Sequence, residues 1–180
     1  MKMKSRAEDI RSYVFEPTDE LLLDANIWFF VYGPGEPGDW RVAVYSRALD
    51  KILRAKSRIY IDVLIASEFI NAYARLKYNI LNPGVAFKRF RQSADFKPIA
   101  QDVAADVRRV LQHCTRVESG FPALDINALI YEYEKGNSDF NDQVLANLCK
   151  SKGLKLVTDD RDFKDRGLTV VTANRHLLTR

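Results

Sequence analysis

The sequence holds few cysteines and histidines. Its two cysteines, Cys114 and Cys149, lie far apart in the chain, and no CxxC pair or Cys/His cluster surrounds them. A structural zinc site and a disulfide-rich secreted fold are therefore excluded, and two reduced, buried thiols are expected. Neither His113 nor His176 belongs to a catalytic motif, so the sequence offers no histidine-based active site.

Long hydrophobic stretches are also missing. The longest apolar run, Ile27–Tyr32, is far shorter than the roughly 20 residues that a membrane-spanning helix needs. Acidic residues such as Glu8, Asp9 and Glu16 occupy the region where a signal peptide would be apolar. We therefore expect a cytoplasmic protein with no membrane contact.

The charge balance is only slightly basic. The chain has 28 Lys and Arg against 24 Asp and Glu, a net charge of +4, and so small an excess favours an anionic partner only mildly. Its 180 residues suit one domain. We expect residues 1–20 to form a lead-in segment with at most one short helix, and residues 21–180 to form a single domain.

The apolar pattern predicts alternating strands and helices. A continuous apolar run, Leu21–Leu23, ends on Asp24 and is typical of a central strand that is buried on both faces. Further strands are predicted over 58–63, 154–158 and 168–172, and helices over 40–57, 66–80, 97–114, 124–134 and 139–152, the last after the start signal Asn137-Ser138-Asp139. Helices outweigh strands, which favours an α/β fold with a short, mostly parallel sheet flanked by helices.

Six acidic residues stand where predicted strands end or predicted helices begin: Asp24, Glu68, Asp139, Asp142, Asp159 and Asp160. Strand ends and helix starts of a parallel sheet share one edge, so these side chains can converge. Clustered carboxylates cannot all ionise in a partly buried site unless a cation neutralises them. Oxygen-only ligands select hard cations such as Mg²⁺ or Mn²⁺, and such a centre suits the hydrolysis of phosphodiesters.

Each acid also has a purely structural interpretation. An Asp that follows a strand is usually a helix cap, and this applies to Asp24. Asp139 stands at a helix start, where acids are favoured by the helix dipole, and Glu68 is compatible with a solvated helix surface. The joint placement of the acids, rather than any one of them, favours the metal site.

Four segments resemble the PIN-domain nucleases. They are Leu21–Trp28, Ser67–Phe69, Asp139–Ala146 and Leu156–Phe163, which are similar to the family's opening strand, its helix-borne Glu, its helix Asp, and its strand with a Thr-x-Asp-x-x-Phe turn. The resemblance spans residues 21–172 and is weaker over a helical, basic insertion at about 79–123. It implies a PIN-like three-layer sandwich and a metal-dependent endoribonuclease. The family's VapC-type toxin branch implies an antitoxin partner and a homodimer.

The resemblance also implies roles for individual residues. The catalytic, metal-binding acids would be Asp24, Glu68, Asp142 and Asp160, with Asp139 as an auxiliary metal-site acid. Asn26 and Thr158 would support the site by hydrogen bonding. Asp159 stands beside Asp160 and leaves the fourth acid open, although the Thr-x-Asp spacing favours Asp160.

A basic, aromatic segment, Phe87–Arg91, alternates rings with cations. Proteins that bind single-stranded nucleic acid place cations on phosphates and stack rings on bases. Lys88, Arg89 and Arg91 are therefore candidate contacts to an RNA substrate. An equally open alternative places the two Phe rings in the core and leaves the cations in water.

Two other functions compete with the Mg²⁺- or Mn²⁺-dependent ribonuclease. One is a non-catalytic nucleic-acid-binding module on the same scaffold. The other is a dinucleotide-dependent enzyme, because Gly33–Gly38 matches G-x-G-x-x-G. That motif binds pyrophosphate through backbone N–H groups, and Pro34 and Pro37 each remove one such donor, so the match is disfavoured.

Overall fold

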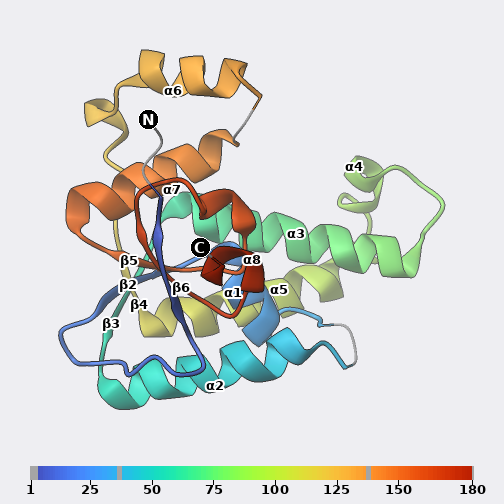
Figure 1. Cartoon of the computed structure of the whole chain (residues 1–180). Coiled ribbons are helices and arrows are strands. Elements are labelled where there is room, and N and C mark those ends of the chain that lie inside the picture. Colours follow the sequence, from blue (N-terminus) through green and yellow to red (C-terminus); the bar gives the residue numbers. More distant parts are fainter. Residues whose placement is uncertain (1–3, 36–37, 137–138, 180) are drawn as a thin grey trace.

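The computed structural model describes residues 4–35, 38–136 and 139–179. Within these residues, one sheet of six strands has the order β1-β6-β5-β2-β3-β4 (Figure 1). The strands are β1 (Arg6–Asp9), β2 (Glu20–Leu23), β3 (Arg58–Ile61), β4 (Cys114–Arg116), β5 (Lys155–Val157) and β6 (Thr169–Thr172). Every pairing in this sheet is parallel.

Helices connect these parallel strands. The segment between β2 and β3 holds α1 (Ala25–Tyr32) and α2 (Trp40–Ala55), and the segment between β3 and β4 holds α3 (Val63–Leu81), α4 (Phe87–Phe90) and α5 (Phe96–His113). The 3-10 turn η1 (Phe121–Ala123), α6 (Ile126–Glu134) and α7 (Phe140–Lys152) precede β5, η2 (Arg161–Phe163) precedes β6, and α8 (Arg175–Leu178) follows it. No helix in the described parts of the chain has the length and hydropathy that a membrane crossing requires.

The helices cover both faces of the sheet. In Figure 1, α7 and α6 lie above the strands, and α2 and α5 lie below them. Helix α1 packs against α2 and α3, α3 packs against α5, and α6 packs against α7. The sheet is therefore the middle layer of a three-layer α/β sandwich, which confirms the predicted fold class.

Strand β2 occupies the middle of the sheet, between β5 and β3. Its residues Leu21–Leu23 are fully buried, because a parallel strand that is covered on both faces exposes neither set of side chains. Trp28 on α1 is also fully buried and anchors the helix that begins directly after β2. The short step from β2 to α1 fixes Asp24 at the carboxyl edge of the sheet.

Both edge strands differ from the sequence-based expectation. Residues 6–9 form β1 along β6 instead of the short helix allowed for the lead-in segment, and residues 114–116 form β4 where only the end of a helix was expected. An edge strand pairs on one side only, so it tolerates polar side chains such as Glu8 and Arg116. These strands therefore lack the apolar pattern by which a buried strand is predicted. Cys114 lies on the edge strand β4 and is half-buried, whereas Cys149 is buried, and both thiols are free.

The Gly33–Gly38 loop lacks the context of a dinucleotide fingerprint. Residues 36–37 lie outside the described residues, but the loop follows helix α1 rather than a strand. A dinucleotide fingerprint comes directly after a strand and opens a helix. Gly33 has a structural role instead, because a Cβ there would lie 2.6 Å from the carbonyl oxygen of Phe29.

We expect Leu22→Ala to lower the free energy of unfolding by about 2–5 kcal/mol, because it opens a cavity at the centre of the sheet. Urea denaturation monitored by circular dichroism measures this loss. Leu81→Ala is the matched control: that side chain is 56% exposed, and its truncation should change stability by less than about 0.5 kcal/mol. Equal losses for the two variants would contradict the placement of β2 in the core.

Candidate metal centre

Asp24 is held at the carboxyl end of β2 by three hydrogen bonds. Its Oδ1 accepts from the Ala25 backbone N–H at 2.7 Å, which caps α1. Its Oδ2 accepts from Asn26 Nδ2 at 2.6 Å and from Thr158 Oγ1 at 2.7 Å. Asp24 is only 5% exposed. The helix-cap interpretation of this residue is therefore correct, and it does not prevent a second role in the site.

Thr158 links the ends of the two neighbouring strands β2 and β5. It is fully buried, and its hydroxyl donates to Asp24 while accepting the Asp160 backbone N–H at 3.0 Å. Asn26 Nδ2 also donates to Thr158 Oγ1 at 3.2 Å. These bonds give a physical reason for the Thr-x-Asp spacing, because the threonine positions one acid through its side chain and the other through the backbone.

Three further acids come from helices. Glu68 lies on α3, Asp139 caps α7 by accepting from the Asn141 backbone N–H at 2.8 Å, and Asp142 lies in the first turn of α7. Residues 137–138 of the predicted start signal lie outside the described residues. Helix α7 therefore delivers acids to the edge of the sheet where β2 and β5 end.

The tightest group in the described residues consists of Asp142, Asp160 and Asp162, each of which offers a carboxylate oxygen within 4.8 Å of the others. Asp162 was not among the residues predicted from the sequence. Its backbone N–H donates to Asp160 Oδ1 at 2.9 Å in the turn η2. An acid two positions after the Asp of a Thr-x-Asp turn is the signal that would have identified it.

The predicted acids are close enough to influence one another's pKa values. Desolvation, followed by repulsion from Asp24, Asp139 and Asp160, raises the pKa of Glu68 to about 7, although the residue is exposed at the protein surface. Desolvation and the charges of Asp160, Asp24 and Asp139 likewise raise the pKa of Asp142 to about 7.

The surroundings of Asp24 act on its pKa in opposite directions. Burial raises its pKa, hydrogen bonds from Thr158 and the Ala25 backbone lower it, and the charge of Asp160 raises it again. The result is a pKa above the ordinary value for an aspartate. The acids therefore repel one another, and a cation that binds among them would relieve the repulsion.

Asp159 points away from this group. Its Oδ1 accepts from Tyr45 Oη at 2.6 Å, and Arg41 Nη1 lies 3.9 Å from its Oδ2. Asp160, by contrast, lies in the acid cluster. The geometry thus separates two adjacent carboxylates that the sequence left ambiguous.

The predicted nucleic-acid contacts Lys88 and Arg89 lie on α4, and Arg91 directly follows this helix, near the far end of α3 (Figure 1). Phe90 is buried, while Lys88, Arg89 and Arg91 are exposed. The guanidinium groups of Arg75 and Arg91 lie over the Phe87 ring, 4.7 and 5.9 Å from its centroid. The rings are thus occupied by protein contacts, which removes base stacking from the expectation but leaves the cations accessible.

The donor set fits a hard divalent cation. Asp142, Asp160 and Asp162 offer carboxylate oxygens close to one another, and no thiol or imidazole belongs to this group of described residues. The charges of Asp24 and Glu68 couple to the same acids. Mg²⁺ and Mn²⁺ prefer such ligands, whereas zinc prefers nitrogen and sulfur. Mutual repulsion among the acids is the second feature that favours a cation here.

A sequence model of the PIN domain matches residues 21–168. The chain belongs to the PIN-domain family. PIN domains are nucleases, so membership supports a nuclease-type role for the acid cluster. The match covers most of the chain and includes every acid of the cluster.

Solved structures share the PIN-domain fold of this chain. One is VapBC2 from Rickettsia felis bound to a DNA fragment from their promoter, with 13% identity, a TM-score of 0.54, and coverage of 86% of this chain and 98% of that chain. Another is PAE2754 from Pyrobaculum aerophilum, with 16% identity, a TM-score of 0.50, and coverage of 90% and 94% respectively. At these identities the likeness concerns the fold alone. A search of curated proteins found no match.

We expect Asp142→Asn to stabilise the metal-free protein at alkaline pH. The pKa of Asp142 is raised to about 7 from an ordinary value of 3.8, so its ionisation destabilises the folded state, and this cost grows as the pH rises from the lower value to the higher one. The amide removes the cost, by on the order of 1 kcal/mol at pH 8, since solvent screens part of the repulsion. Near pH 4 the variant and the wild type should be almost equally stable. Thermal melting in EDTA at both pH values measures the difference.

Millimolar Mn²⁺ should reverse the sign of this effect, because the amide then lacks a ligand through which the cation stabilises the fold. Asp50→Asn is the control, since Asp50 is an exposed acid on α2 that pairs with Arg54. A melting temperature that changes equally in EDTA and in Mn²⁺ would show that Asp142 has only a structural role.

Proposed function

We propose that the protein is a Mg²⁺- or Mn²⁺-dependent endoribonuclease. The observation that supports this most is the acid cluster, which gathers carboxylates from β2, α3, α7 and the turn after β5 at one edge of a PIN domain. A site with no catalytic duty has no need to hold so many like charges together.

Some residues of this site would bind the cation, and others would hold those ligands in place. Asp24, Asp142 and Asp160 would bind the cation, with Asp162, Glu68 and Asp139 as further acids around it. A bound divalent cation would polarise a phosphodiester oxygen and make water a stronger nucleophile. Thr158 and Asn26 would fix the orientation of Asp24 through the bonds described above. With pKa values raised to about 7, the carboxyl groups of Glu68 and Asp142 would be partly protonated near neutral pH, so cation binding would release protons and strengthen as the pH rises.

A route for the RNA strand is suggested along α3. Asn71 and Arg75 follow Glu68 at helical spacing on one face of α3. They line a cavity of about 680 Å³ together with Phe87, Lys88 and Arg91 of the α4 segment. Arg75 stands about two helical turns after Glu68 on α3, so these exposed cations are placed to contact phosphates next to the bond that is cleaved. We therefore retain Lys88 and Arg91 as RNA contacts and include Arg89 beside them.

The proposal extends to a toxin–antitoxin pair. The resemblance to VapC-type toxins and the shared fold with VapBC2 support a role for this chain as the toxin, with an antitoxin and a second copy of the chain as partners. A cytoplasmic location agrees with this role.

Cleavage of a mixed RNA pool tests the activity directly. We expect cleavage in millimolar Mn²⁺ and none in EDTA, and we expect Asp142→Asn and Asp24→Asn to reduce the rate by more than about a hundredfold, because each deletes a ligand of the cation. Asp50→Asn should cleave as the wild type does. RNA that is bound but left intact under all conditions would favour the non-catalytic binding module instead.

The salt dependence of RNA binding tests the α4 cations. Replacing Lys88, Arg89 and Arg91 together by Ala should flatten the plot of log affinity against log salt by about one unit per lost phosphate contact. Fluorescence anisotropy of a labelled RNA at several salt concentrations measures the slope. A triple variant of Arg54, Lys150 and Lys152, all exposed and outside this segment, matches the change in charge. The same slope in both triple variants would place the α4 cations on an ordinary solvated surface.

A further inference from the structure

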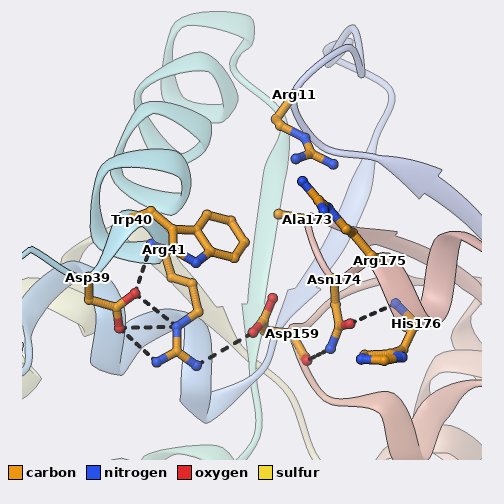
Figure 2. Close-up of a pocket in the computed structure, with 9 residues that line it drawn as sticks. All are labelled: Arg11, Asp39, Trp40, Arg41, Asp159, Ala173, Asn174, Arg175 and His176. Carbon is orange, nitrogen blue, oxygen red and sulfur yellow. Dashed lines mark hydrogen bonds and ion pairs between the residues drawn. The ribbon is translucent and has the colours of Figure 1, made fainter.

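A second basic pocket lies beside the acid cluster. It encloses about 600 Å³ and is lined by Arg11, Trp40, Arg41, Asp159, Arg175 and His176, among others (Figure 2). Arg11 follows β1, Trp40 and Arg41 open α2, and Arg175 and His176 open α8 after β6. The pocket is therefore assembled from segments that are far apart in the sequence.

The pocket and the acid cluster occupy the same edge of the sheet. Asp159 lines the pocket and Asp160 belongs to the cluster, so adjacent residues of one turn form the border between them. The Asp159 backbone N–H donates to Asn26 Oδ1 at 3.2 Å, and Asn26 also holds Asp24. A polyanionic strand whose scissile phosphate sits at the cluster would have this pocket within reach of a neighbouring nucleotide.

Arg11 and Arg175 leave guanidinium donors for an anion, whereas Arg41 is engaged by Asp39 and Asp159. Arg11 pairs with Asp9 and Arg41 pairs with Asp39, each at 2.8 Å and each through the Nε and Nη2 side of the group. Arg175 makes no ion pair among the residues that the structure describes. Figure 2 shows the Arg11 and Arg175 side chains pointing toward one another across the pocket. Two like charges that face each other are stabilised by an anion between them, and guanidinium groups match phosphate geometry.

Trp40 supplies an exposed aromatic surface in the same pocket. It is 53% exposed, whereas the chain's other tryptophan, Trp28, is fully buried. Tryptophan offers a large face on which a base can stack, and stacking combined with adjacent cations is the usual means of holding single-stranded nucleic acid. An exposed ring in the same pocket as the Arg11 and Arg175 guanidinium groups fits a base next to its own phosphate.

We propose that this pocket binds a phosphate and its adjoining base of the single-stranded RNA, one step along the strand from the acid cluster. Arg175 and Arg11 bind the phosphate, and Trp40 stacks on the base. Arg41 is held by Asp39 and lies near Asp159, which keeps the border between pocket and cluster in place. The inference rests on the proposed ribonuclease function and identifies residues that would bind the substrate next to the acid cluster.

Tryptophan fluorescence tests the pocket directly. A ten-nucleotide RNA of mixed sequence, added in EDTA, should quench the emission of Trp40 while the buried Trp28 remains unquenched. We expect quenching in the wild type and in Arg47→Ala, an exposed arginine of α2 outside the pocket. Trp40→Phe should abolish the quenching. Arg175→Ala should weaken binding by about fivefold or more and lower the salt slope by about one unit.

Cleavage of the same RNA in Mn²⁺ separates this inference from the proposed function. Arg175→Ala should raise KM with little change in kcat, because it removes substrate binding and leaves the acids intact. If the wild type cleaves RNA but shows no quenching, and Arg175→Ala binds and cleaves as Arg47→Ala does, the pocket is not a substrate site although the ribonuclease function stands. If RNA quenches Trp40 but is never cleaved, the proposed function fails while the nucleotide pocket stands.

Discussion

Repulsion among carboxylates at one edge of the sheet is the constraint on which the rest of the structure depends. Asp24 is almost fully buried, and burial together with neighbouring acids raises the pKa of Glu68 and of Asp142 to about 7. Charges so placed separate unless rigid elements hold them together. The fully buried strand Leu21–Leu23 and the anchored helix α1 provide that rigidity, so the hydrophobic core at the centre of the sheet is what makes the acidic site possible.

Hydrogen bonds then determine which way each acid faces. Thr158 and Asn26 join the ends of β2 and β5 and orient Asp24 between them. The same turn sends Asp160 into the cluster and Asp159 toward Tyr45. Two adjacent carboxylates thereby acquire different surroundings, one among acids and the other beside the hydroxyl of Tyr45 and the guanidinium of Arg41.

The sequence predicts those parts of the molecule whose structure follows from the residue pattern of a single segment. The apolar run Leu21–Leu23 identifies the central strand, and the position of acids after strands identifies the edge at which they gather. The edge strands β1 and β4 escaped prediction because polar residues such as Glu8 and Arg116 satisfy an edge without apolar alternation. The different orientations of Asp159 and Asp160 also escaped it, because they depend on Tyr45, which lies 114 positions away in the chain. Contacts between distant segments leave no trace in local spacing.

The distribution of charge matters more than the net charge of +4. The acid cluster borders a basic pocket that contains Arg11, Arg41 and Arg175, and a second group of cations, Arg75, Lys88 and Arg91, lines a cavity farther along α3 from Glu68. A polyanionic strand is attracted to both groups of cations but repelled by the carboxylates. A divalent cation in the cluster would offset the negative charge of those carboxylates. Cation binding and substrate binding would therefore strengthen each other, because each relieves a repulsion that opposes the other.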